Sequence, residues 1–286
     1  PISTIVSAAA TPAAKLEVLA SLGISADDLG ASADDAAAAV QAFLAKDVWA
    51  EAVAGDPVAQ AIQTKNVQLT EVLVSAVNVT DTSDAATAVA RAVTMTKSFA
   101  EGLVTQAAAG NAIINTEVAA DGSVSFKVVE AIVSDALVVA VRTYTSLATI
   151  TDTSLDTLVA DATALAAFAD DLTAVITNVT DQLNFADITD VSAVAIITSA
   201  KNSAEAAVVE IATAVVAADA TELASYASGS ASSTIAQAVA TEETKVAATI
   251  AAAVSEAATT ASETAVDETN TGYALPEVIS VLETVE

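Results

Sequence analysis

Apolar side chains recur every three or four residues along most of the chain, which is the spacing of amphipathic helices. The two longest stripes lie within residues 155–179 and 194–215, and each predicts one long helix. A third stripe follows the break and restart at Gly55-Asp56-Pro57, with apolar positions at Val58, Ile62, Leu69, Val72 and Val77. The segment from Asp47 to Val79, which also carries Trp49, is therefore expected to organise the helices around it.

Short helices with polar starts are predicted before that segment. Thr11 and Pro12 fit an N-cap and a first helical residue, and Gly23 fits the end of that helix. Residues 25–28 and 32–35 each place a serine and two aspartates where the helix dipole favours negative charge. We interpret these aspartates as parts of helix caps rather than as ligands of Ca²⁺. Further polar breaks are expected at residues 81–84, 151–154, 187–190, 228–230 and 270–272, and another helix is expected to begin near Leu275.

Residues 106–125 interrupt the helical pattern. Gly110-Asn111 and Asp121-Gly122 are turn signals, and apolar residues alternate with polar ones directly after the second turn. This alternation predicts a small β-hairpin near residues 113–128. Apolar spacing further along the chain predicts a helix from about 125 to 150.

The predicted fold class is all-α, an elongated multi-helix bundle with that small hairpin. Three parts are expected: an N-terminal short-helix subdomain (1–109), a linker or hairpin (110–124) and a long-helix bundle subdomain (125–286). Hydrophobic residues make up 54% of the chain but aromatic residues only 3%, so the core must be built from small side chains. Helices with small side chains at their contacts can approach closely, near the lower end of the roughly 8–10 Å range.

Two features point to contacts beyond a single chain. Val138, Val139 and Val141 lie beside the main stripe of their predicted helix and leave apolar surface for packing against another molecule. Trp49 fits either a core anchor or an interface residue, and the sequence leaves both interpretations open.

The charge of the chain limits its partners. The formal net charge is −28, with seven basic and sixteen acidic residues in 1–145 and two basic and twenty-one acidic residues in 146–286. Such a surface disfavours nucleic acid and anionic membranes, because both are bound through Lys and Arg. It would attract divalent cations, of which oxygen-preferring Ca²⁺ is the natural candidate. The alternative is a solvated acidic surface without an ordered ion, and no cofactor is otherwise expected.

No constellation for catalysis is present in the sequence. Histidine and cysteine are absent, which excludes Ser-His-Asp and Cys-His arrangements and the usual zinc sites. Phosphate-binding glycine loops and EF-hand loops are also missing. The acidic pairs Asp170-Asp171 and Glu242-Glu243 are adjacent on predicted helices and lack aromatic platforms for sugars. We therefore predict that the protein is not an enzyme and assign no catalytic, cofactor-binding or metal-binding residue.

No transmembrane segment is predicted. The most apolar stretch, residues 136–150, is interrupted by Arg142 and by several Ser and Thr, and falls short of the ~18 apolar residues that a span needs. The chain begins at Pro1 rather than at a methionine, and we interpret it as a processed or excised piece.

Several segments in the first quarter of the chain resemble those of a known class of proteins. The segments concerned are Pro1–Val6, Leu19–Gly23, Gly55–Pro57 and Gln63–Asn66. Together, over residues 1–79, they resemble a helical segment of very large secreted bacterial repeat proteins of the adhesin-like, cadherin-like or RTX type. The resemblance implies an exported protein at the cell surface or outside the cell. It brings no functional residues with it, and the glycine-aspartate repeats that bind Ca²⁺ in RTX proteins are missing here.

These observations together predict an extracellular structural or adhesive protein. It would be a subunit of a surface layer, matrix or filament, present as a homo-oligomer or polymer assembled by helix-face packing. The first alternative is a stalk or spacer module of a giant secreted adhesin that does not assemble. The second is an amphipathic protein associated with a surface or with lipid, although the Lys and Arg that would flank its apolar faces are scarce.

Overall fold

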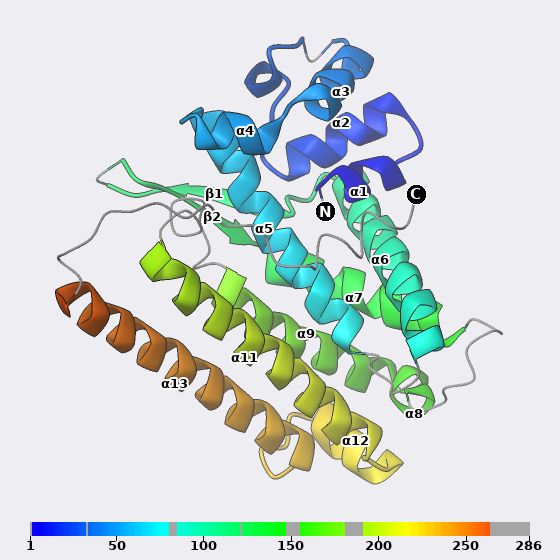
Figure 1. The fold of residues 1–286 in the computed structure, drawn as a ribbon. Coiled ribbons are helices and arrows are strands. Elements are labelled where there is room, and N and C mark those ends of the chain that lie inside the picture. Colours follow the sequence, from blue (N-terminus) through cyan, green and yellow to red (C-terminus); the bar gives the residue numbers. More distant parts are fainter. Residues whose placement is uncertain are drawn as a thin grey trace.

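The protein folds mainly into α-helices, with one two-stranded antiparallel hairpin (Figure 1). The computed structural model describes residues 2–32, 34–79, 85–120, 122–146, 155–180 and 191–263. The all-α fold class with a small hairpin is therefore confirmed. The breaks predicted at 81–84, 151–154, 187–190 and 270–272, and the helix predicted from Leu275, lie outside the described residues.

Short capped helices form the N-terminal part, at the top of Figure 1. They are α1 (Ile2–Ala8), α2 (Pro12–Ser21), the 3₁₀ turn η1 (Asp27–Leu29), α3 (Ala36–Ala45) and α4 (Val48–Val53). The side chains of Thr11, Asp35 and Asp47 each accept a hydrogen bond from a backbone N–H in the first turn of their helix. Ser25 and Asp28 bind each other's backbone N–H groups reciprocally beside η1, as in a capping box, whereas α3 is capped by Asp35 and not by the predicted Ser32.

Helix α5 (Pro57–Asn78) lies at the centre of the molecule. Asp56 is its N-cap, whose carboxylate accepts the N–H of Ala59 at 2.7 Å, and the helix packs against α1, α4, α6, α9, α11 and β2. That the segment 47–79 organises the other helices stays a prediction. Helix α6 (Ala85–Ala108) runs beside α5 and packs closely on α7 (Glu130–Thr145).

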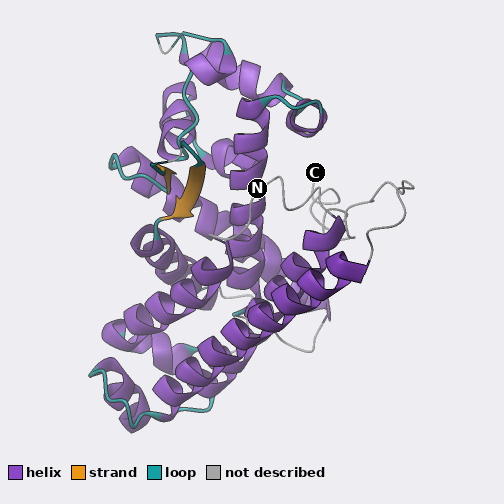
Figure 2. Ribbon diagram, turned by 90° about the vertical axis from the view of Figure 1, so that its left-hand side faces the viewer, coloured by secondary structure: helices purple, strands orange, loops and turns teal. Residues whose placement is uncertain are grey.

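The hairpin joins α6 to α7. Strands β1 (Ile114–Val118) and β2 (Val124–Val128) pair in the register Ile114↔Val128 and Val118↔Val124, and Gly122 at the turn has φ 87°. The predicted hairpin is thus confirmed, and Figure 2 shows it at the side of the helices. The predicted start of the next helix at 125 was wrong. The alternating residues 124–128 pair as a strand, and α7 begins only at Glu130.

Long helices build the second half. They are α9 (Ala162–Thr180), α11 (Val191–Val216) and α13 (Thr234–Glu263), with the short helix α8 (Asp156–Ala160) before α9 and the short helix α12 (Ala220–Ala227) between α11 and α13. The single helix predicted over 155–179 was wrong. Asp161 separates α8 from α9, since its carboxylate accepts the N–H groups of Thr163 and Ala164 and so caps a new helix. The break predicted at 228–230 is confirmed as the loop between α12 and α13.

One continuous cluster of buried apolar residues extends from Ile2 to Val246. Small side chains allow close helix contacts: a Cβ added to Gly102 of α6 would lie 3.0 Å from Cα of Ala136 in α7. The surplus apolar surface predicted on α7 is mostly part of this core. Val141 is buried, Val138 packs against the core, and of these three valines only Val139 is exposed. The core-anchor interpretation of Trp49 was wrong, because its side chain is 39% exposed. The division into two subdomains stays a prediction.

Candidate functional site

Polar side chains are buried along one face of the central helix α5. Lys65, Gln68 and Glu71 are spaced three residues apart and therefore lie on the same side of the helix. They are 2%, 1% and 0% exposed, whereas residues of these types are almost always at the surface unless paired. We call these three residues the polar seam.

Lys65 ties α5 to the end of α2. Its Nζ donates a hydrogen bond to the carbonyl oxygen of Gly23 at 2.7 Å and lies 4.6 Å from the ring centroid of Phe126 in the hairpin. Burial lowers the pKa of Lys65 to about 8, against an opposing effect of Asp28. Gly23 adopts φ 65°, and a Cβ at this position would lie 3.1 Å from Nζ of Lys65. The turn after α2 and the lysine thus fit each other closely.

Gln68 connects three elements. Its Nε2 donates to the carbonyl oxygen of Phe126 in β2 at 2.9 Å and to that of Thr180 in α9 at 3.0 Å. The first acceptor lies in the hairpin and the second at the last residue of α9, where helix carbonyls have no intrahelical partner. A single side chain therefore satisfies two carbonyls and fixes both elements to α5.

Glu71 carries a buried charge. Its Oε2 lies 3.1 Å from Nζ of Lys201 in α11, and Glu205 follows one turn later on α11. Burial raises the pKa of Glu71, an effect that Lys201 opposes and Glu205 reinforces. Burial likewise raises the pKa of Glu205 against the opposing charge of Lys201. Two carboxylates thus share one lysine at the contact between α5 and α11.

The acidic pairs singled out in the sequence have structural partners. Asp170 accepts a hydrogen bond from Ser134 at 2.6 Å, and Asp171 accepts one from the Tyr226 hydroxyl at 2.5 Å. Burial raises the pKa of Asp171, and the Tyr226 hydrogen bond opposes this shift. Glu242 is buried and pairs with Lys245 at 2.5 Å, while Glu243 is exposed.

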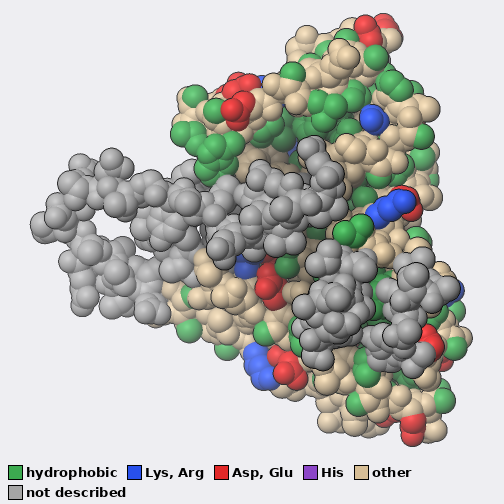
Figure 3. Space-filling view, turned by 45° about the vertical axis from the view of Figure 1, so that its right-hand side comes forward, with side chains coloured by type: hydrophobic (Ala, Val, Ile, Leu, Met, Phe, Trp, Pro, Cys, Tyr) green, Lys and Arg blue, Asp and Glu red, His purple; other side chains and the backbone are tan. Residues whose placement is uncertain are grey.

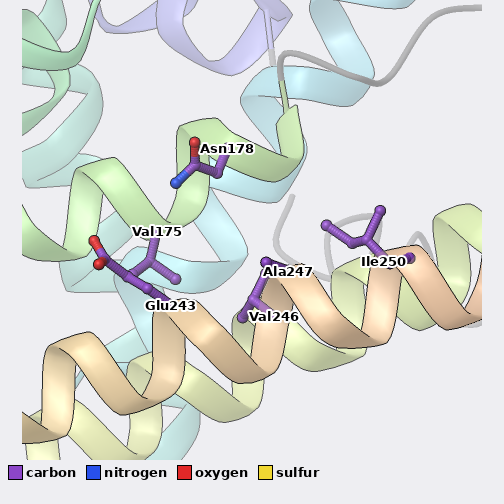
Figure 4. A pocket seen from close by; sticks show the side chains of 7 residues that line it. Val175, Asn178, Glu243, Val246, Ala247 and Ile250 are labelled. Carbon is purple, nitrogen blue, oxygen red and sulfur yellow. The ribbon is translucent and has the colours of Figure 1, made fainter.

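Two shallow hollows are open to the surface. One of about 370 Å³ lies between α9 and α13 and is lined mainly by Val175, Val246, Ala247 and Ile250, with Asn178 and Glu243 at its rim (Figure 4). The other, about 210 Å³, lies between α1, α3 and α5. Binding sites for small molecules usually combine apolar walls with several convergent polar groups. Among the described residues, the first hollow has only two polar side chains in its lining, whereas the second has Ser3, Lys46, Gln63 and Asn66 in its wall.

Within the described ranges, no three His, Cys, Asp or Glu side chains come together as a metal site would require. On the face drawn in Figure 3, acidic side chains lie in separate small groups among neutral and apolar ones. None of the helices searched over the described residues is both long and apolar enough to cross a membrane.

Exposed apolar side chains occur in pairs on two elements. Trp49 and Val53 are four residues apart on α4, hence on one face, and Val53 is 61% exposed. Val118 and Val124 face each other across the free end of the hairpin and are 68% and 54% exposed. Both elements project on the left-hand side of Figure 1.

The polar seam was missed in the sequence. A Lys-Gln-Glu row at helical spacing normally indicates a solvated face. The available signal was that apolar residues border this row on both sides of the helix, Leu69 and Leu73 on one side and Val67 and Val74 on the other. A search against known proteins gives no counterpart: no family model, curated protein or solved structure matches this chain.

Proposed function

We propose that this chain is a structural or adhesive protein of the cell exterior, a subunit of a surface layer, matrix or filament. The observation that carries the proposal is the contrast between its polar and apolar groups. The polar side chains of the seam are buried inside the fold, whereas Trp49, Val53, Val118 and Val124 are presented to solvent. Tryptophan is among the residues that most often anchor protein contacts, and neighbouring apolar side chains help to exclude water around such an anchor.

Copies of the same chain are the proposed partners. A contact in which the α4 pair of one copy meets the hairpin pair of the next joins two different surfaces, and such contacts propagate into filaments or layers when they do not close into rings. The resemblance of residues 1–79 to segments of large secreted surface proteins agrees with this use. The proposal includes no catalytic role and no cofactor.

Charge would set the conditions for assembly. Each chain carries a formal charge of −28, so copies repel one another at low ionic strength. Salt screens this repulsion, and Ca²⁺ would reduce it further by binding carboxylate oxygens. We therefore expect assembly to need salt or divalent cations.

Negative-stain electron microscopy and light scattering, with Ca²⁺ and with a chelator, test the proposal. Ordered filaments or sheets are expected for the wild-type chain, and they should be lost in Trp49→Ser/Val53→Thr and in Val118→Thr/Val124→Thr. Val139→Thr is the matched control, since Val139 is an exposed valine on α7, away from both pairs. Dispersed single particles of the wild type under all conditions would overturn self-assembly and favour a stalk or spacer. Co-sedimentation with lipid vesicles would instead favour the surface-associated alternative.

A further inference from the structure

Two carboxylates and one ammonium group meet where α11 packs on α5. Glu71 is fully buried, Lys201 is 30% exposed and 3.1 Å away, and Glu205 lies one turn further along α11, partly buried. With both acids ionised, this cluster holds one negative charge in excess inside the fold. Removing such a charge from water is costly, and the single lysine can offset it for only one of the two acids.

The charges acting on Glu71 come from α11 alone among the described residues. These are Lys201, which attracts it, and Glu205, which repels it. The described charged groups of the other elements that pack on α5 lie elsewhere. Asp170 and Asp171 of α9 bind Ser134 and Tyr226. Ion pairs hold Lys97 with Glu101 in α6, Lys127 of β2 with Glu117, and Glu51 of α4 with the partly buried Lys46. On α5 itself, Lys65 points to Gly23, two turns before Glu71.

We propose that the contact between α5 and α11 is a proton-operated clasp, in which uptake of a proton by the Glu71–Lys201–Glu205 cluster strengthens the docking of α11 on α5. Helix α13 packs mainly on α11, which in turn packs on both α5 and α9, so α13 depends in part on the same contact. A mildly acidic medium would make the second half of the fold more resistant to opening than a neutral one.

The direction follows from linkage. Burial raises the native pKa of Glu71 and of Glu205 above the ordinary value of 4.5. A carboxyl whose pKa is higher in the folded than in the unfolded chain destabilises the fold at neutral pH. This destabilisation is removed as the pH falls through the raised native pKa values. Below pH 4.5 the carboxyls of the unfolded chain are protonated too, so the fold gains no further stability from them.

Urea unfolding of the dilute, monomeric chain between pH 8 and pH 5 tests the clasp. High salt is used throughout, because it screens the repulsion among exposed carboxylates and spares buried pairs. Since salt should also favour assembly, light scattering at each pH verifies that the diluted chain is monomeric. The unfolding equilibrium constant of the wild type should decrease as the pH is lowered from 8 to 5, by up to about tenfold per pH unit for each proton taken up. Glu205→Gln should be more stable than the wild type at pH 8 and should depend less on pH.

Two further variants separate the cluster from general charge effects. Lys201→Met leaves Glu71 without its counter-charge, so it should be less stable than the wild type at pH 8 and should depend more steeply on pH. Glu17→Gln removes the same charge as Glu205→Gln from an exposed site on α2 and should keep the wild-type slope. Parallel pH profiles for all four proteins would overturn the proposal. Because the measurement uses monomers, its outcome does not depend on whether the chain assembles.

Discussion

Helices α5 and α13 are both long, but α5 is buried or partly buried over most of its surface and α13 is buried along one stripe. The centrally placed α5 buries Lys65, Gln68 and Glu71 as well as an apolar stripe. Helix α13 packs chiefly on α11 and buries side chains at intervals of three or four residues, at Ile235, Val239, Glu242 and Val246. Its remaining described side chains, mostly Ala and Thr, are exposed or partly exposed.

This difference separates two ways of stabilising a helix. A polar group inside a closely packed helix contact is costly to leave unpaired, and α5 meets part of this cost through distant partners such as the Gly23, Phe126 and Thr180 carbonyls. An outer helix depends on intrinsic propensity, one buried stripe and its caps. Substitutions of the same type should therefore cost far more in or beside α5 than in or beside α13.

The largest expected difference is between two glutamines. Gln68→Ala removes two hydrogen bonds and leaves the buried carbonyls of Phe126 and Thr180 unsatisfied, which should lower the free energy of unfolding by about 2–4 kcal/mol. Gln237→Ala removes one bond of 3.3 Å on the exposed side of α13 and should cost less than about 0.5 kcal/mol. Urea unfolding of both variants measures the contrast. Equal losses would show that the seam contributes no more than a surface contact.

Two glycines give a smaller and more specific difference. Gly23 and Gly229 both adopt positive φ, so alanine at either position should cost about 1–2 kcal/mol from backbone strain. Only at Gly23 would the added Cβ also crowd Lys65 Nζ at 3.1 Å and Thr116 Oγ1 at 3.3 Å. Gly23→Ala should therefore lower the thermal midpoint more than Gly229→Ala. Identical midpoints would mean that the lysine moves aside without cost.

The smallest expected effect concerns pH at the start of α13. Glu222 accepts hydrogen bonds from Ser233 Oγ and from the N–H of Thr234, both at 2.6 Å, and these bonds lower its pKa. A lowered native pKa stabilises the fold above 4.5, and this stabilisation is lost as the pH falls through the native value.

Acid should therefore loosen the start of α13, whereas it strengthens the contact at α5. Amide hydrogen exchange of residues 234–237, corrected for intrinsic rates, should be faster in Glu222→Gln than in the wild type at pH 6, and this difference should shrink as the pH falls through the lowered native pKa of Glu222. A difference that stays the same as the pH falls would contradict the assignment.

Local signals predicted much of the fold. Asp56 and Pro57 fixed the start of α5, and the turn residues with alternating valines predicted the hairpin. Two errors arose where one pattern fitted two structures. Residues 125–128 fitted a helix as well as a strand, and the apolar stripe of 155–179 concealed the cap at Asp161. In both places a few hydrogen bonds decided the local structure. The spacing of apolar residues carries no information about such bonds.

The candidate site was not predictable in the same way. Lys65, Gln68 and Glu71 have the composition of a solvated face, and their acceptors and counter-charge lie 42, 58, 112 and 130 positions away at Gly23, Phe126, Thr180 and Lys201. Likewise, only the packing revealed that Trp49 faces outward and Val141 inward.

The sequence by itself determined that this chain is helical, where most helices begin and that its net charge is strongly negative, because caps, periodicity and composition act over a few residues. Tertiary structure alone decided which polar groups are buried and which apolar groups stay exposed. Burial depends on neighbours brought together from distant parts of the chain, and no local pattern specifies them.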